Sequence, residues 1–174
     1  MDERICYFFS FLIEGLVFWN YVSILFVPKY STKIRFVCLS SGFFILFLSS
    51  LHNVFLLNCI LYTTVCFLYL IFLYKTSWYY ALFHSLLFEV LTGACELPVY
   101  SFLSTFLTSA SLRAADFHLK LLFAVMSKTL FFAVMSVLLL WLKKRQKPFL
   151  QYDKSVFFTI LIPFIAQIIV LILI

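Results

Sequence analysis

Residues 53–74 read NVFLLNCILYTTVCFLYLIFLY and contain no charged side chain. At a rise of 1.5 Å per residue, a helix of this length spans about 33 Å, which is enough to cross the roughly 30 Å hydrocarbon core of a bilayer. A strand of a membrane β-barrel would be about ten residues long and would alternate apolar with polar residues. This stretch therefore predicts a membrane-spanning α-helix.

Five further apolar runs of similar length lie on either side of this stretch. The whole chain, residues 1–174, is therefore expected to form a single all-α domain, a polytopic membrane helix bundle with six transmembrane helices. The expected spans are residues 5–27, 35–51, 53–74, 79–107, 118–142 and 155–174.

The composition supports a membrane protein and excludes several other classes. Apolar residues make up 65% of the chain and charged residues only 11%, whereas soluble domains contain about 25% charged residues. Three glycines are too few for a glycine-rich phosphate loop, and none of the five cysteines forms a Cys-x-x-Cys pair. No metal site or cofactor is expected.

The distribution of Lys and Arg predicts how the spans are oriented. Lys128 lies within a span. Of the other twelve bases, nine lie at or in the loops after the first, third and fifth spans. Because cytoplasmic loops are enriched in Lys and Arg, these loops are expected in the cytoplasm, with the amino terminus outside and, after six spans, the carboxyl terminus outside as well. These juxtamembrane bases suit contact with the lipid bilayer, and no nucleic-acid partner is expected.

Four ionisable side chains within the spans are the most informative residues. Glu14, Glu89 and Lys128 each lie about 14–15 Å along their helices, near the bilayer middle, where a charge costs at least about 2.5–3.5 kcal/mol. This depth favours a pair between Glu89 and Lys128. Glu96 competes if the helix kinks at Pro98, and Glu14 is a candidate third member. Two interpretations remain open, a structural ion pair and a switch that changes partners.

A Cys and His pair offers an enzymatic alternative. His52 and Cys59 are seven residues apart, a spacing also found in integral-membrane peptidases that process pheromone precursors, and such a pair combines a nucleophile with a base. His52 falls at a turn, however, and no acid stands nearby to orient its imidazole. We therefore expect no catalytic residue in this chain.

The order of these features resembles the membrane sensor region of quorum-sensing histidine kinases of the accessory-gene-regulator type, whose kinase half belongs to the GHKL ATPases. The resemblance is a pattern of spans and loops over the whole chain. The stretches that carry it are Phe11-Leu12-Ile13-Glu14 with Pro28-Lys29-Tyr30-Ser31-Thr32-Lys33, Tyr74-Lys75-Thr76-Ser77-Trp78-Tyr79-Tyr80, Cys95-Glu96-Leu97, Met126-Ser127-Lys128, and Lys143-Lys144-Arg145-Gln146-Lys147-Pro148 with Pro163.

The resemblance implies a receptor for an extracellular peptide-type signal, transmitted by helix movement to a cytosolic kinase. Ligand is then expected at the outer loops, near His52, Asn53, Arg113 and Asp116. The expected partners are a second copy of the chain or a full-length sensor kinase. No kinase module follows the last span in this sequence, so the chain is expected to correspond to a sensor cut short before its kinase.

Two other classes share the same broad pattern. Six spans and a basic loop also describe the substrate-binding subunits of energy-coupling-factor vitamin importers, in which a midplane Glu and Lys site would bind a solute. A membrane scaffold protein without any ligand is the third alternative.

Overall fold

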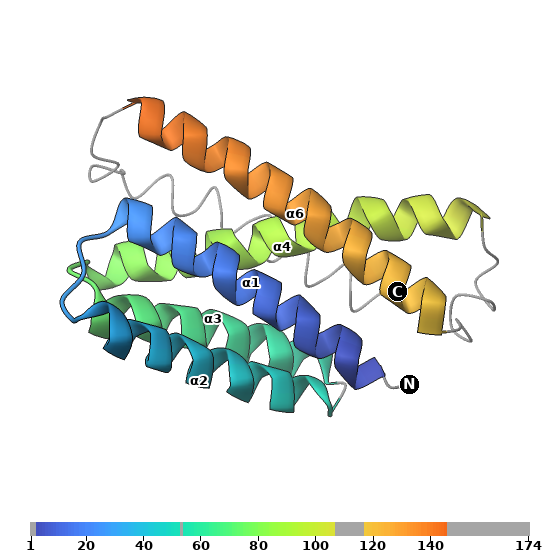
Figure 1. Ribbon diagram of the computed structural model, residues 1–174, viewed down its shortest axis with the longest axis horizontal. Coiled ribbons are helices and arrows are strands. Elements are labelled where there is room, and N and C mark those ends of the chain that lie inside the picture. The colour runs from blue at the N-terminus through green and yellow to red at the C-terminus, as the bar shows by residue number, and fades with distance from the viewer. Residues whose placement is uncertain (1–2, 53, 107–116, 146–174) are drawn as a thin grey trace.

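The computed structural model describes residues 3–52, 54–106 and 117–145, and Figure 1 shows the helices that these residues form. The helices are α1 (Glu3–Leu25), α2 (Thr32–Ser50), α3 (Phe55–Leu73), α4 (Trp78–Phe106) and α6 (Phe117–Arg145). Each coincides within a few residues with one of the first five expected spans. The sixth expected span, residues 155–174, lies outside the described residues.

All five described helices are long and apolar enough to cross a membrane. Large apolar side chains such as Phe8, Leu16, Val37 and Leu140 remain exposed on the outside of the bundle. Such exposure is stable in lipid, because acyl chains are as apolar as a protein core, while the helix satisfies its own backbone hydrogen bonds. The protein is therefore a multi-pass membrane protein.

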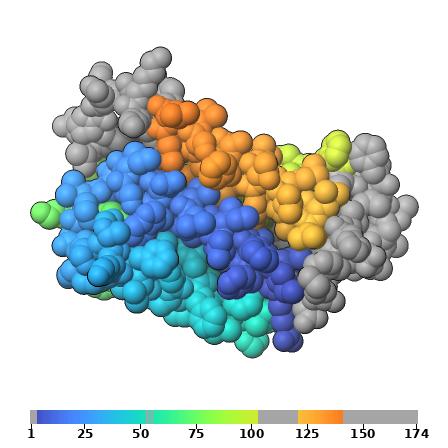
Figure 2. Space-filling view, viewed as in Figure 1, coloured from blue at the N-terminus to red at the C-terminus, as the bar shows by residue number. Residues whose placement is uncertain are grey.

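The described helices close into a ring. α1 packs against α2 and α6, α3 packs against α2 and α4, and α4 packs against α6. Successive helices run in opposite directions (Figure 1), and Figure 2 shows α1 lying between α2 and α6 on the face in view. Every helix therefore has an inner stripe that faces the other members of the ring.

Aromatic side chains fill the middle of this ring around Phe88 of α4. The Phe88 ring centroid lies 4.9 Å from that of Phe18 in α1 and 5.3 Å from that of Phe131 in α6. Tyr62 of α3 stacks on the same ring at 6.2 Å. Phe18, Phe88 and Phe131 are fully buried. Such edge-on and stacked pairs add about 0.5–1.5 kcal/mol each beyond area burial.

Two loops are joined by hydrogen bonds at one end of the bundle. The backbone N–H of Lys29 donates to the carbonyl of Leu73 at 2.9 Å, and that of Lys75 donates to the carbonyl of Val27 at 2.8 Å. Lys29 Nζ also donates to the carbonyl of Ile71 at 2.7 Å, satisfying an acceptor in the last turn of α3. The carboxyl-terminal end of α6 lies at the same end of the bundle as these two loops (Figure 1).

Candidate functional site

Lys128 of α6 is the centre of a charge cluster inside the bundle. Only 5% of Lys128 and 4% of Glu14 is exposed. The Lys128 ammonium donates to Glu14 Oε1 of α1, and to Glu96 Oε1 of α4 at 2.5 Å. One ammonium thus joins three helices. Glu14, which the sequence offered only as a candidate third member, is one of the two acids that contact the lysine.

The predicted pair between Glu89 and Lys128 is wrong. The Glu89 carboxylate instead accepts a hydrogen bond from the Thr63 hydroxyl of α3. Glu96, two turns further along α4, forms the ion pair with Lys128. Depth counted along each helix assumes parallel axes, whereas α6 crosses α4 obliquely (Figure 1). The crossing brings Lys128 beside Glu96, the competitor that the sequence left open.

A polar cavity of about 190 Å³ lies beside this cluster. Its four positions on α4, Glu89, Thr92, Gly93 and Glu96, follow the i, i+3, i+4, i+7 spacing of one helix face. The remaining lining residues come from α1, α2 and α3, and they are Phe11, Glu14, Leu46, Asn58, Cys59 and Tyr62. Glu14 and Glu96, the two acids of the cluster, therefore border the same cavity as Glu89.

Two polar groups of the cavity wall, the Tyr62 hydroxyl and the Glu96 carboxyl group, differ in their exposure. The Tyr62 hydroxyl is buried in the wall, beside the Glu14 carboxyl group and the Thr92 hydroxyl. Glu96 is the most open member, with 40% of its side chain exposed, compared with 6% for Glu14. In the described part of the chain, no group of His, Cys, Asp and Glu side chains is arranged to hold a metal ion.

His52, one of the residues expected to face a ligand, lies at the other end of the bundle from the joined loops (Figure 1). His52 is exposed in the turn after α2, and its backbone N–H donates to the carbonyl of Ser49 at 3.0 Å. Asn53, Arg113 and Asp116 lie outside the described residues. Cys59, the suggested partner of His52, is half-buried and lines the polar cavity, which His52 does not line.

Arg35 is a buried cation whose role the sequence reading missed. It lies inside α2 with 8% of its surface exposed, so it is not one of the exposed bases that mark the loop after α1. Its Nη1 donates to the Tyr74 hydroxyl at 2.9 Å, and its guanidinium carbon lies 5.0 Å from the centre of the Trp19 ring. The aromatic residues Trp19 and Tyr74, on neighbouring segments, were the available signal in the sequence, because Arg side chains stack on aromatic faces.

A second buried polar contact joins α1 to α4. The Tyr21 hydroxyl lies 2.5 Å from Nδ1 of His84, and both side chains are buried. The edge of the Phe26 ring meets the same imidazole, with 5.0 Å between ring centroids. Interhelical hydrogen bonds of this kind are the usual role of neutral polar residues within membrane spans.

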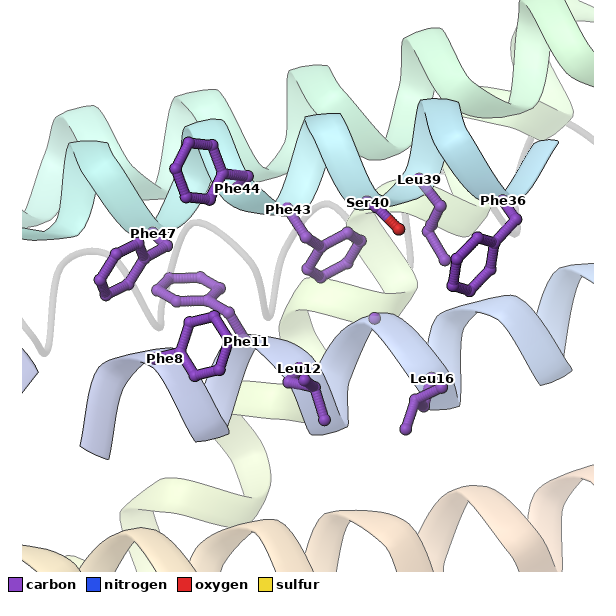
Figure 3. A pocket seen from close by; sticks show the side chains of 11 residues that line it. Phe8, Phe11, Leu12, Leu16, Phe36, Leu39, Ser40, Phe43, Phe44 and Phe47 are labelled. Atoms are coloured by element: carbon purple, nitrogen blue, oxygen red, sulfur yellow. The ribbon is translucent and has the colours of Figure 1, made fainter. Parts of the chain in front are cut away.

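A larger apolar groove lies between α1 and α2, and Figure 3 shows the side chains that line it. Its volume is about 450 Å³. Ser40 is the one polar side chain in the wall, which is otherwise built from Phe8, Phe11, Leu12, Gly15, Leu16, Phe36, Leu39, Phe43, Phe44 and Phe47. In a bilayer, acyl chains solvate such a surface, so this groove by itself does not indicate a ligand site.

Comparison with known proteins found no matching family model, no similar curated protein and no similar solved structure.

Proposed function

We propose that this chain is the membrane sensor region of a two-component receptor resembling quorum-sensing histidine kinases of the accessory-gene-regulator type. An extracellular peptide-type signal meets the outer loops, and helix movement carries the response to the cytoplasmic end. Kinase activity then resides in a full-length sensor that pairs with this chain, or in a region that follows this one.

The sharing of Lys128 between two acids is the observation that carries the proposal. Buried ion pairs contribute little net stability and are best known for fixing register or for switching. Glu14 and Glu96 belong to different helices, and both accept a hydrogen bond from the one ammonium. A ligand that favours a different spacing of α1 and α4 would change how the ammonium is shared, because ligands act through their different affinities for two states.

The proposed orientation places the joined loops and the end of α6 in the cytoplasm. Eight of the eleven bases other than Lys128 and the buried Arg35 support this orientation. The turn that holds His52 then faces outward, where a secreted peptide would reach it. Movement of α6 at its basic end is the proposed output.

The test uses the full chain in lipid nanodiscs and the peptide fraction of spent medium from the organism that encodes it. We expect this fraction to raise the melting temperature, since a ligand of the folded state stabilises it. It should also change hydrogen exchange at the cytoplasmic ends of α1 and α6. Fresh medium and protease-treated spent medium are the controls. A melting temperature that no fraction changes would contradict the proposal.

The polar cavity near the middle of the spans favours one second candidate, a small-solute transport component. Transport predicts uptake of a radiolabelled vitamin by cells that express the chain, together with co-purification of an ATPase. The receptor proposal predicts neither result, so the two functions are separable.

A further inference from the structure

The end of the bundle that carries the joined loops has positive charge and no acid to balance it. Residues 15–88 contain no Asp or Glu, and they include α2, α3 and both joined loops. Lys29 and Lys75 belong to these loops, and Lys33 and Arg35 belong to the start of α2. At this end, the described residues therefore offer basic groups but no carboxylate.

Arg35 supplies an independent indication that an anion is missing. It is buried, with 8% exposed, and its Nε has no hydrogen-bond partner among the described residues. The groups that it does contact are neutral. Its Nη1 donates to the Tyr74 hydroxyl, its Nη2 donates to the Thr32 hydroxyl at 3.3 Å, and its guanidinium lies over the Trp19 ring. Because buried charges in proteins are normally paired, this cation lacks its counter-charge.

The first turn of α2 and Lys29 supply further donors at this end. The contact with Thr32 places the Arg35 guanidinium at the first turn of α2. Ser31 caps that helix without a side-chain hydrogen bond, and its first turn contains no acid. The free N–H groups of a helix start suit a phosphate. Lys29 Nζ donates to the carbonyl of Ile71, which leaves two further N–H donors on the ammonium.

An apolar crevice of about 280 Å³ lies between α2 and α3, next to these basic groups. Leu39 and Gly42 line it from α2 at positions i+4 and i+7 from Arg35, so they share its helix face. Leu73 lines it from α3, and the carbonyl of Leu73 accepts a hydrogen bond from the backbone N–H of Lys29. A ligand with an anionic head and an apolar chain therefore fits the basic groups and the crevice together.

We propose that this end of the bundle binds one anionic phospholipid. Its phosphate pairs with Arg35 and Lys29 at the first turn of α2, and one acyl chain lies in the crevice between α2 and α3. The site lies where two spans, Thr32–Ser50 and Leu56–Leu73, end, which is the depth of lipid headgroups. A zwitterionic headgroup fits less well, because it brings a cation toward bases that have no acid among them. The inference goes beyond the proposed function and does not rest on it.

The first test compares two headgroups. The full chain is purified in dodecyl maltoside micelles, and native mass spectrometry counts the lipids that remain bound after titration with dioleoyl phosphatidylglycerol or dioleoyl phosphatidylcholine. The two lipids share their acyl chains and their phosphate but differ in net charge. We expect one phosphatidylglycerol to bind at least about tenfold more tightly, a difference of about 1.4 kcal/mol. Equal binding of the two lipids would overturn the proposal.

A competition experiment distinguishes a lipid from a soluble phosphate. Glycerol 3-phosphate carries the phosphate but no acyl chain, so an equimolar amount should leave the bound phosphatidylglycerol in place. Displacement of the lipid by equimolar glycerol 3-phosphate would identify the occupant as a soluble anion and reject the crevice as part of the site.

Two variants then test the headgroup contacts. Lys29→Gln removes a cation at an exposed position and is expected to weaken phosphatidylglycerol binding by about tenfold. Its matched control is Lys33→Gln, because Lys33 is exposed and lies two residues from Arg35, away from the face that lines the crevice. Arg35→Gln should also lose the preference for phosphatidylglycerol, and Lys29→Gln decides the question if that variant does not fold. Unchanged lipid preference in folded Lys29→Gln would reject the assigned contacts.

A third variant tests the position of the acyl chain. Cys38 is exposed and lines the crevice, whereas its neighbour Val37 is exposed but does not line it. We expect Cys38→Phe, which fills part of the crevice, to weaken phosphatidylglycerol binding by at least about threefold. Val37→Phe adds a similar ring outside the crevice and should leave binding unchanged. Equal binding to both variants would place the acyl chain elsewhere and overturn this part of the proposal.

Discussion

Lys128 is the residue on which the balance of charge inside the bundle depends. Its ammonium lies between the carboxylates of Glu14 and Glu96, and the lysine is buried. Removal of one partner from a buried ion pair is costly, since the charges left behind are neither solvated nor paired. In this bundle, the loss of the lysine leaves two acids facing each other.

We predict that Lys128→Met lowers the free energy of unfolding by about 3–5 kcal/mol. Addition of Glu14→Gln should restore part of that loss, because it removes one of the stranded charges. Addition of Glu89→Gln should restore much less, since Glu89 bonds to Thr63 rather than to the lysine. Denaturation of the four proteins in detergent measures these differences. Equal recovery from the two Gln substitutions would reject the assigned pairing.

Arg35 provides a second test at the scale of single residues. Its guanidinium lies over the Trp19 ring and donates to the Tyr74 hydroxyl, and lysine has no planar group to reproduce both contacts. We predict that Arg35→Lys costs about 1–2 kcal/mol. Lys33→Arg, at an exposed site on the same helix, should change stability by less than about 0.5 kcal/mol. Comparable losses from both variants would argue against the role assigned to Arg35.

At the scale of helices, Gly42 allows the close approach of α2 and α3. A Cβ atom added at Gly42 would lie 2.8 Å from Cγ1 of Val65, whereas one added at Gly15 would lie 3.4 Å from the Phe43 ring. The Val65 side chain is β-branched and therefore has few alternative rotamers. The α2 and α3 contact is thus much less tolerant of an added methyl group than the contact between α1 and α2.

We predict that Gly42→Ala destabilises the bundle by about 1–3 kcal/mol, the usual cost of overpacking. In the Val65→Ala background the same substitution should cost far less, which a double-mutant cycle measures. Gly15→Ala serves as the control and should be nearly neutral, since the gain in helix propensity offsets a mild contact. An unchanged cost of Gly42→Ala when Val65 is truncated would contradict the assigned contact.

At the scale of the whole molecule, the ring places the loops after α1 and α3 and the carboxyl-terminal end of α6 at one end (Figure 1). The proposed orientation places that end in the cytoplasm. We predict that alkaline phosphatase fused after His52 is active, and that the same enzyme fused after Lys75 or Arg145 is inactive. Green fluorescent protein at the same three sites should give the reverse pattern. Active phosphatase after Lys75 would invert the orientation.

The sequence predicted the class of the protein and the positions of the described helices. Their boundaries depend on local features, namely continuous apolar runs and the polar or proline-containing segments between them. It also identified Glu14, Glu89, Glu96 and Lys128 as the important polar residues, because ionisable groups stand out against an apolar background. These inferences needed no knowledge of which helices are neighbours.

Only the tertiary structure decided which of these residues meet. Helix faces directed at lipid and at the core are both apolar, so the sequence does not mark the inner face as it does in a soluble bundle. Because α6 crosses α4 obliquely, Lys128 lies beside Glu96 rather than beside Glu89. The packing of α1, α2, α3 and α4 forms the polar cavity. Crossing angles and cavities arise from contacts between distant segments, which local apolar patterns do not encode.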